Sequence, residues 1–454
     1  MPTTLPGSGA SPPAKPGLER AIGTISATAL VVGIIVGASI FVQPSEITRE
    51  VPSLGGTAAV WLAAAALTLG GALIVAELAS AFPRSGGVYV FLRESISPGA
   101  AFLWGWAMFW SMQTGILAAV AVVFGRYLAW FVPVGETGIR VLAIAAILVV
   151  SAVNLFGVRY GNRLQAAFTL VKVLSIAGLT AVGFALGARL PAHFVVAPGG
   201  SVPPSGGALL RALAAGLFAF GGWHMVTYTA GETRDAARTI PRALLLGLPI
   251  VAACYVALNA MYLYVLPLAV VVRSTRVAAD AADAVLGSGG AAAMSALVVF
   301  SAIGGLSGLV LTAPRVYQRM AEDGLAFRWL GAIHPRWRTP HRAIALQALW
   351  GSLLVATGSY RELVARVVYT EWIFFAVLAL GLLRLRSRPD YRPAWRVPAA
   401  PVVVVGFALA ALTVAGEEVV SRPGARLAGL ALVAAGIPVY LFWTSRRARA
   451  APSS

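Results

Sequence analysis

Residues 33–41 read GIIVGASIF and lie inside a long apolar run that begins near residue 21. A run of this length predicts one continuous membrane-spanning helix. Small residues nevertheless cluster near its middle: Gly33, Gly37, Ala38 and Ser39. Glycine weakens a helix interior by about 1 kcal/mol relative to alanine. We therefore expect this helix to break between residues 33 and 39.

The composition is that of a polytopic membrane protein. Of the 454 residues, 59% are hydrophobic and 11% are charged, whereas a soluble domain carries about 25% charged residues. A bilayer crossing needs about 20 mostly apolar residues, and such runs predict an all-α fold with twelve membrane-spanning helices, of which the ninth is short. The runs are at 21–48, 56–82, 99–131, 139–156, 164–187, 208–230, 243–267, 285–312, 343–357, 363–383, 400–419 and 425–444.

The basic residues indicate the topology. A net charge of +18 would suit a nucleic-acid partner, but most of these residues fall on one side if the amino terminus is cytoplasmic. The positive-inside rule then predicts that both termini are cytoplasmic. Residues 1–19, rich in Pro, Gly and Ser, are expected to be a disordered tail, and residues 445–454 a second tail. We expect a multi-pass protein of the cell's inner membrane, with the lipid bilayer and not nucleic acid as its partner.

A second glycine interruption lies in the sixth run, where residues 217–224 read LFAFGGWH. Each interrupted helix begins a block of five runs, at 20–190 and 208–383, and the last two runs at 400–444 follow. Broken segments at matching places in two halves indicate a transporter built from inverted repeats. The alternative for the first break is close helix packing, because Gly33 and Gly37 are four residues apart.

A mid-membrane break has a physical use. Every backbone group inside lipid must be paired, so unwound residues are tolerated only where they line a cavity or bind a ligand. A half-helix that begins at the break directs N–H groups toward a carboxylate, and one that ends there directs carbonyls toward an ammonium group. An α-amino acid carries both groups on one carbon and fits this arrangement.

Several motifs then identify a family resemblance. GIIVGASIF is followed by Gln43 and Pro44, AELASAFPRSGGVYVF occupies 76–91, and GETRDAARTIPRA follows the sixth run at 231–243. LTAPRVYQRMAEDGLAF at 311–327 and RPAWRVPAAP at 392–401 come later. In this order the motifs resemble the amino acid–polyamine–organocation (APC) transporters, and within them the L-type amino acid transporter branch. The resemblance implies a leucine-transporter-type fold and amino acid transport by alternating access, with no cofactor and no metal.

The chain departs from the family pattern at three positions. Gly37-Ala38-Ser39 replaces a usual Gly-Ser-Gly, His224 stands where the L-type branch often has asparagine, and Glu371 stands where a neutral polar residue is common. The loop around VPVGETG lacks the cysteine that joins animal L-type transporters to a heavy chain. Cys254 is the only cysteine, so no disulfide-linked heavy chain is expected.

The resemblance assigns substrate contacts to residues at and near the two breaks, with Phe218 as an aromatic lid that also gates the site. Packing alone would also explain the aromatic residues. The residues expected to contact substrate are Ile35, Gly37, Ala38, Ser39, Gln113, Phe218, Phe220, Gly221, Trp223 and His224.

Lys172 is an ionisable residue in the fifth run. It lies eight residues past Leu164, or about 12 Å into a core about 30 Å thick, where an unpaired charge costs several kcal/mol. Lysine can lose its proton when buried, whereas arginine effectively cannot. The resemblance implies that Lys172 replaces the sodium ion of coupled relatives and bridges the first break and Ser301. The alternative is a structural pairing with backbone carbonyls, and the two roles are compatible.

The other polar candidates have both functional and structural interpretations. His224 follows the second break directly, so it is either a substrate or pH-sensing contact or a neutral hydrogen-bonding residue. Glu77 and Glu232 lie close to helix ends, near Arg84 and Arg234. We expect cytoplasmic ion pairs that close the inner gate there, with solvated helix ends as the alternative.

The sequence favours a sodium-independent secondary transporter of neutral L-amino acids, working as an exchanger or a proton-linked permease. A cationic amino acid or polyamine permease or antiporter of the same fold is the alternative, and a nutrient sensor on the transporter fold is a more distant one. Neither a metal-ligand cluster nor a nucleophile motif is present to indicate an enzyme.

Overall fold

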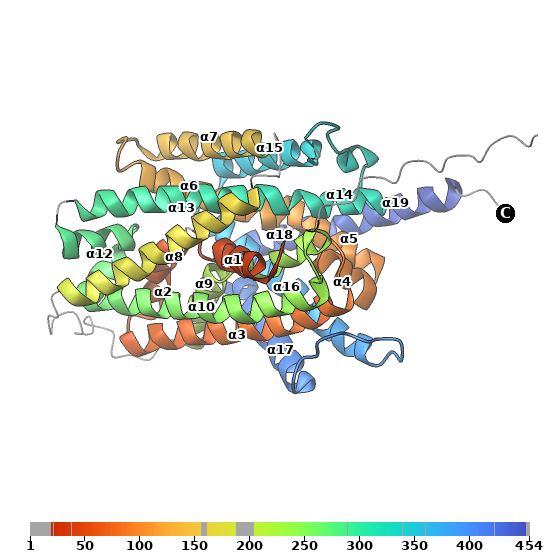
Figure 1. The fold of residues 1–454 in the computed structure, drawn as a ribbon, viewed down its shortest axis with the longest axis horizontal. Helices are drawn as coiled ribbons and strands as arrows, with labels where there is room; N and C mark the ends of the chain where they lie inside the picture. The colour runs from red at the N-terminus through yellow and green to blue at the C-terminus, as the bar shows by residue number, and fades with distance from the viewer. Residues whose placement is uncertain are drawn as a thin grey trace, which may run out of the picture.

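The computed structural model describes residues 20, 22–37, 39–155, 161–187, 204–287, 289–337, 339–358, 360–421 and 423–450. The regular structure of this part of the chain is helical (Figure 1). The predicted tail 1–19, Ala38 and residues 451–454 lie outside the described residues.

Within the described residues, the first half of the chain contains eight α-helices. They are α1 (Thr24–Ile35), α2 (Gln43–Glu50), α3 (Leu54–Ala81), α4 (Val88–Ser95), α5 (Pro98–Ala107), α6 (Gln113–Leu128), α7 (Glu136–Leu155) and α8 (Gly161–Leu186). The second half contains α9 (Gly206–Ala219), α10 (Ala236–Val265), α11 (Leu268–Arg273), α12 (Val277–Leu286), α13 (Gly290–Thr312), α14 (Pro314–Glu322), α15 (His341–Thr357), α16 (Tyr360–Arg386), α17 (Ala400–Ser421), α18 (Pro423–Ala434) and α19 (Gly436–Ala450). The described residues also form the helical segments η1 (Ser39–Phe41), η2 (Met108–Met112), η4 (Trp223–Glu232) and η5 (Arg328–Gly331).

The described residues contain eleven segments that are long and apolar enough to cross a membrane, which agrees with an all-helical polytopic membrane protein. The ninth predicted crossing corresponds to α15, which has 17 residues and is shorter than the roughly 20 residues of a typical crossing. It packs along α6 and α7. A count of twelve crossings and the inverted repeat stay predictions.

Helices α3, α7, α10 and α13 run along a common direction, α8 and α17 cross it, and α1 lies near the centre of the view (Figure 1). Helix α1 packs against α8 and α10, α3 packs along α10, and α7 lies beside α15 (Figure 1). Helix α16 packs along α17. Helix α1 has no polar face, and its residues 30–33 are all buried. Its central position, with other helices around it, explains why this stretch is buried on every side.

Serine residues fix where three crossings begin. The side chains of Ser53, Ser97 and Ser205 each accept a hydrogen bond from the backbone N–H three residues later, at 3.1, 3.1 and 3.2 Å. These bonds satisfy donors that a helix N-terminus otherwise leaves unpaired. They set the starts of α3, α5 and α9.

Two predicted crossings are less regular than their apolar runs suggest. The run at 99–131 contains a π-helical turn, η2, between α5 and α6. The hydroxyl of Thr114 donates to the carbonyl of Phe109, five residues earlier, at 2.7 Å, and π-turns of this kind often mark functional sites. The last run is divided into α18 and α19, and α19 continues as a helix to Ala450, into the predicted tail.

Candidate functional site

The first helix is broken, as predicted, but the break begins later than the glycines indicate. Helix α1 continues to Ile35 because the N–H of Val36 still donates to the carbonyl of Val32 (2.8 Å). Gly33 is therefore helical, which corrects the predicted start. The N–H of Gly37 donates to the carbonyl of Ile35 (2.7 Å) and not to that of Gly33. The break thus leaves the Gly33 carbonyl without its helical donor.

The second break lies at Phe220–Gly222, between α9 and η4. Gly222 has φ +91°, a left-handed conformation that only glycine adopts without strain. The segment after the break is a 3₁₀-helix and not the predicted α-helical half. The hydroxyls of Thr227 and Thr229 donate to carbonyls three residues earlier, at 2.6 and 2.8 Å. These side-chain bonds, which compete with α-helical bonding, explain the tighter winding.

Tyr255 of α10 joins the two breaks. Its hydroxyl lies 2.8 Å from the carbonyl oxygen of Ile35 and 3.1 Å from that of Ala219, the last residues of α1 and α9. Its ring packs against Trp61 and Phe220, with centroids 5.6 and 5.0 Å away. One phenol therefore lies between the last carbonyls of the two broken helices, and the Ile35 carbonyl also accepts from the N–H of Gly37.

Replacing Tyr255 with phenylalanine is expected to lower the rate of substrate uptake at least fivefold. The ring packing remains, but the carbonyls of Ile35 and Ala219 lose the one O–H group that lies between them, and leaving a buried acceptor unpaired costs about 1–3 kcal/mol. Uptake by purified protein in liposomes measures the effect. The matched control is Tyr264→Phe on the same helix, and an unchanged rate in the Tyr255→Phe variant would contradict this role.

Lys172 of α8 reaches the first break. Its side chain is 1% exposed, and Nζ lies 3.4 Å from the carbonyl oxygen of Gly33, which the break has freed. The ammonium group also lies beside Gly304 of α13, where a methyl group would be 3.4 Å from Nζ. Ser301, one turn earlier on α13, is buried, and its hydroxyl has no hydrogen-bond partner in the described part of the chain. The structure thus brings Lys172 to the first helix and next to α13, without a bond to Ser301.

His224 lies at the start of η4, directly after the second break, and faces Glu371 of α16. The atoms His224 Nε2 and Glu371 Oε1 are 3.6 Å apart, with side-chain exposures of 1% and 8%. Four aromatic rings surround the imidazole, with centroids 5.1–5.9 Å from it: Trp104, Trp223, Tyr228 and Phe375. The predicted substrate-contact residue therefore forms a buried acid–base pair in an aromatic environment.

The remaining predicted contacts are buried around the breaks. Phe220 packs against Trp61 and Tyr255, and the indole of Trp223 lies against Phe375 (5.1 Å). Phe218 is 8% exposed, and Gln113, which follows the π-turn η2, is buried with its Nε2 unpaired. Ile35, Gly37, Ser39 and Gly221 lie in or beside the breaks. Roles in substrate contact stay predictions.

The predicted cytoplasmic glutamates form ion pairs, but with distant arginines. Arg386 of α16 donates to the fully buried carboxylate of Glu77 through Nη2 and through Nε (2.9 Å), and the N–H of Val397 donates to it as well (2.7 Å). Arg315 of α14 holds Glu232 at 2.7 Å. Neither sequence neighbour takes part, since Arg84 pairs with Glu94 at 3.4 Å. Gating by these pairs stays a prediction.

Two other contacts close the same end of the bundle. Residues before α1 pair with the end of η4: the N–H of Ile22 donates to the Glu232 carbonyl (3.0 Å), and the N–H of Arg234 donates to the Ile22 carbonyl (2.9 Å). Nearby, Tyr89 donates to Asp323 (2.9 Å). Burial, together with the charge of Asp323, raises the pKa of Tyr89 well above its ordinary value, so the phenol stays protonated as a donor.

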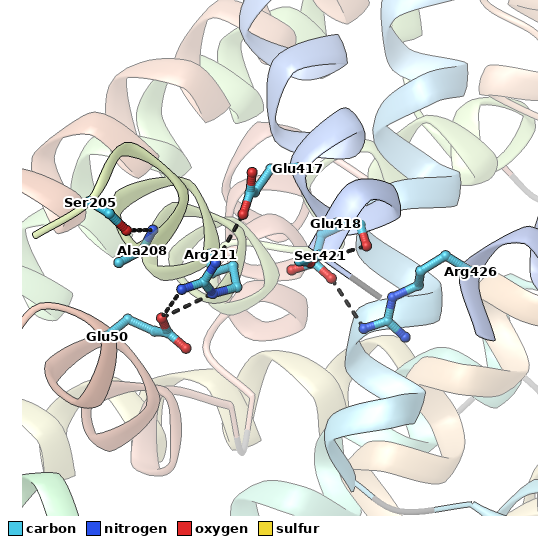
Figure 2. A network of polar contacts seen from close by, with 8 residues as sticks. All are labelled: Glu50, Ser205, Ala208, Arg211, Glu417, Glu418, Ser421 and Arg426. Carbon is cyan, nitrogen blue, oxygen red and sulfur yellow. Dashed lines mark hydrogen bonds and ion pairs between the residues drawn. The ribbon is translucent and has the colours of Figure 1, made fainter. Parts of the chain in front are cut away.

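At the opposite end Arg211 of α9 connects three helices (Figure 2). Its guanidinium lies 2.9 Å from Glu50, the last residue of α2, and 2.9 Å from Glu417 of α17. Beside it Arg426 pairs with Glu418 at 3.2 Å (Figure 2). Helix α2 follows the first break and α9 precedes the second. One side chain therefore holds both segments at this end of the bundle.

Comparison with known proteins agrees with this geometry. The family model described as amino acid permease matches residues 22–434. The chain belongs to the amino acid permease family. The permease is 30% identical over 439 residues to the serine/threonine exchanger SteT of Bacillus subtilis, covering 95% of this chain and 98% of the relative. It is also 30% identical to the human b(0,+)-type amino acid transporter 1 (89% and 84% covered) and to the human large neutral amino acids transporter small subunit 2 (96% and 85%).

Sequence reasoning missed several residues that organise the permease. Tyr255, Arg386, Arg315 and Arg211 were not expected to contact the breaks or the glutamates. A tyrosine inside an apolar crossing was a usable signal, because a buried hydroxyl needs a hydrogen-bond partner. The arginine pairings gave no such signal, since each joins residues more than eighty positions apart.

Proposed function

We propose that the permease is a sodium-independent secondary transporter that moves neutral L-amino acids across the cell's inner membrane by alternating access. The substrate's carboxylate would lie against the backbone N–H groups at the start of η4 or after the α1 break. Its ammonium group would lie against the carbonyls that end α1 and α9. The side chain would contact the aromatic residues beside the second break.

One observation carries the proposal: the two breaks lie against each other inside the bundle. Tyr255 contacts the last residue of each broken helix, and a methyl group on Gly222 would lie 2.6 Å from Ile34. Two unwound segments thus meet inside the bundle, where helix packing requires neither of them. A zwitterion satisfies freed donors and freed acceptors together, which supports an amino acid as the ligand. The relatives, which are named as amino acid transporters and a serine/threonine exchanger, support the same substrate class.

The same arrangement supports the finer proposals on topology. The breaks lie in the first helix of each predicted half, consistent with two inverted repeats. The arginine-rich ends of α14 and α16 would be cytoplasmic, and so would both chain termini. Cys254, the only cysteine in the sequence, lies within α10, so we propose that no heavy chain is joined by a disulfide.

A cationic amino acid or polyamine is the second candidate substrate. Glu371 is the residue that favours this candidate. Its carboxylate faces the imidazole of His224, which follows the second break, and could accept a hydrogen bond from a substrate ammonium group. The neutral substrate is preferred because Glu371 is 6% exposed and already faces His224.

An uptake panel tests the proposal. Purified permease in liposomes preloaded with one neutral amino acid is offered each of the twenty labelled amino acids in turn. We expect counterflow for neutral L-amino acids and none for lysine, arginine or putrescine. Absence of counterflow with every amino acid would overturn the proposed function.

Sodium independence has its own test. We expect wild-type uptake to be the same when choline replaces sodium, because the Lys172 ammonium occupies the position beside the freed Gly33 carbonyl. Lys172→Met removes this charge and should lower uptake at least tenfold. The control is Leu170→Met, whose side chain is 61% exposed on the same helix. Loss of wild-type uptake without sodium would contradict the replacement.

A further inference from the structure

Glu371 differs from every other buried carboxylate in the described part of the chain. Four glutamates are buried there: Glu77, Glu232, Glu371 and Glu418. Three of them pair with arginine, at Arg386, Arg315 and Arg426 respectively. Glu371 faces a histidine at 3.6 Å. An arginine is permanently charged, whereas a histidine gains or loses its charge with a proton.

The surroundings of the pair disfavour a net charge. His224 and Glu371 are almost fully buried, and the rings of Trp104, Trp223 and Phe375 lie within 6 Å of the imidazole or against one another. A carboxylate without a charged partner is costly in such a place. The pair is neutral when it holds one exchangeable proton, either on the carboxyl group or on the imidazole, and it becomes anionic when that proton leaves.

Further polar atoms lie on η4 and on α14. Within the part of the chain that the structure describes, His224 Nδ1 and the hydroxyl of Tyr317 are buried without a hydrogen-bond partner. The ring of Tyr228 lies 5.6 Å from the imidazole, and its hydroxyl donates to the sulfur of Met108 at 3.8 Å. Tyr228 lies four residues beyond His224 on η4, and Tyr317 lies on α14 at the arginine-rich end. These polar groups extend from the pair toward the end of the bundle closed by Arg315 and Glu232.

Several other charged or titratable groups on the elements packed against η4 and α16 are engaged elsewhere. They are Glu77 with Arg386, Tyr89 and Arg93 with Asp323, Glu232 with Arg315, Arg211 with Glu50 and Glu417, Glu418 with Arg426, Tyr369 beneath Arg426, Tyr255 with the carbonyls of Ile35 and Ala219, and Arg126 in the last turn of α6, which also has a partner. The hydroxyl of Tyr262 on α10 is buried without a hydrogen-bond partner in the described part of the chain. The proton balance of the pair is therefore set by His224 and Glu371 themselves, with Tyr228 and Tyr317 as neighbouring hydroxyls.

We propose that His224 and Glu371 form the binding site of one coupling proton, which moves with each amino acid. The inference rests on the proposed transport function. The two groups lie on different elements, and His224 lies two residues after Gly222, whose left-handed conformation (φ +91°) marks the junction between α9 and η4. Separation of η4 from α16 admits water, which solvates the carboxylate and lets the proton leave. Closure without the proton buries a net negative charge, so the occluded state forms with the proton bound.

Proteoliposomes loaded with a pH-sensitive dye test the proposal. Addition of a transported neutral amino acid outside should acidify the lumen of wild-type vesicles. Glu371→Gln keeps the shape of the side chain and removes the exchangeable proton. We expect it to lower the acidification rate at least tenfold while amino acid counterflow stays within threefold of wild type. His224→Gln should lower acidification as well, and Thr370→Val, the neighbouring buried hydroxyl on α16, should change neither rate.

The two readouts separate this proposal from the proposed function. Counterflow without acidification in wild type, or wild-type acidification in Glu371→Gln, would overturn the proton site and leave transport intact. Lysine or arginine counterflow that disappears in Glu371→Gln would also overturn it, because the carboxylate would then bind substrate. If Glu371→Gln does not fold in detergent, acidification by wild type and its loss in His224→Gln decide the question.

Discussion

Replacing Arg386 with methionine is expected to lower the stability of the permease by about 3–5 kcal/mol, the typical cost of breaking a buried ion pair from one side. Glu77 is fully buried, and Arg386 supplies two of the donors that its carboxylate accepts. Without the guanidinium the negative charge loses its cationic partner and keeps the N–H of Val397, at 2.7 Å. The melting temperature of the purified protein in detergent measures the loss.

Two variants make this result specific. Arg384→Met, two residues earlier on α16, removes an exposed arginine that donates only to the Ile96 carbonyl, and should leave the melting temperature nearly unchanged. Adding Glu77→Gln to Arg386→Met removes the unpaired charge and should recover most of the loss. If Arg386→Met melts like Arg384→Met, the pair does not stabilise the fold.

Replacing Gly222 with alanine is expected to lower uptake at least tenfold. The residue has φ +91°, and L-residues in left-handed conformations cost roughly 1–2 kcal/mol. The added methyl group would also lie 2.6 Å from Cγ2 of Ile34. The second break would therefore be pushed away from the first, and the site between them would be deformed.

The two causes of this loss can be separated. Ile34→Ala combined with Gly222→Ala removes the collision and leaves the backbone strain, so it should recover only part of the uptake. Gly206→Ala tests an alanine at a glycine with no atom within 4 Å of the new methyl group, and should transport normally. Uptake in Gly222→Ala equal to that in Gly206→Ala would show that the left-handed turn is dispensable.

The membrane class and the two breaks were predictable because they depend on composition and on local residues. A run of about 20 apolar residues has few alternatives, and glycine weakens a helix wherever it occurs. The exact start of the first break was not predictable, because Val36 keeps its bond to Val32 and carries the helix past Gly33. The 3₁₀ winding of η4 also escaped prediction, since it depends on the hydroxyls of Thr227 and Thr229.

The candidate site was predictable only in part. Lys172 stood out because a charged residue deep in an apolar crossing needs a partner, and the structure supplies the Gly33 carbonyl. Glu77 and Glu232 stood out as acidic residues at helix ends, but their arginines come from elements distant in sequence. Tyr255 was not singled out, because a tyrosine in an apolar run is usually part of the packing. Only the fold shows that its hydroxyl lies between two broken ends.

The 3₁₀ form of η4 determines how far its C-terminal end would move if the segment changed into an α-helix. Runs of more than three or four 3₁₀ residues are uncommon, and each residue rises about 2.0 Å against about 1.5 Å in an α-helix. The ten residues Trp223–Glu232 would therefore shorten by about 5 Å as an α-helix, which is close to one helical turn. A change of winding within one segment would thus draw Glu232 away from Arg315 with no movement of α9.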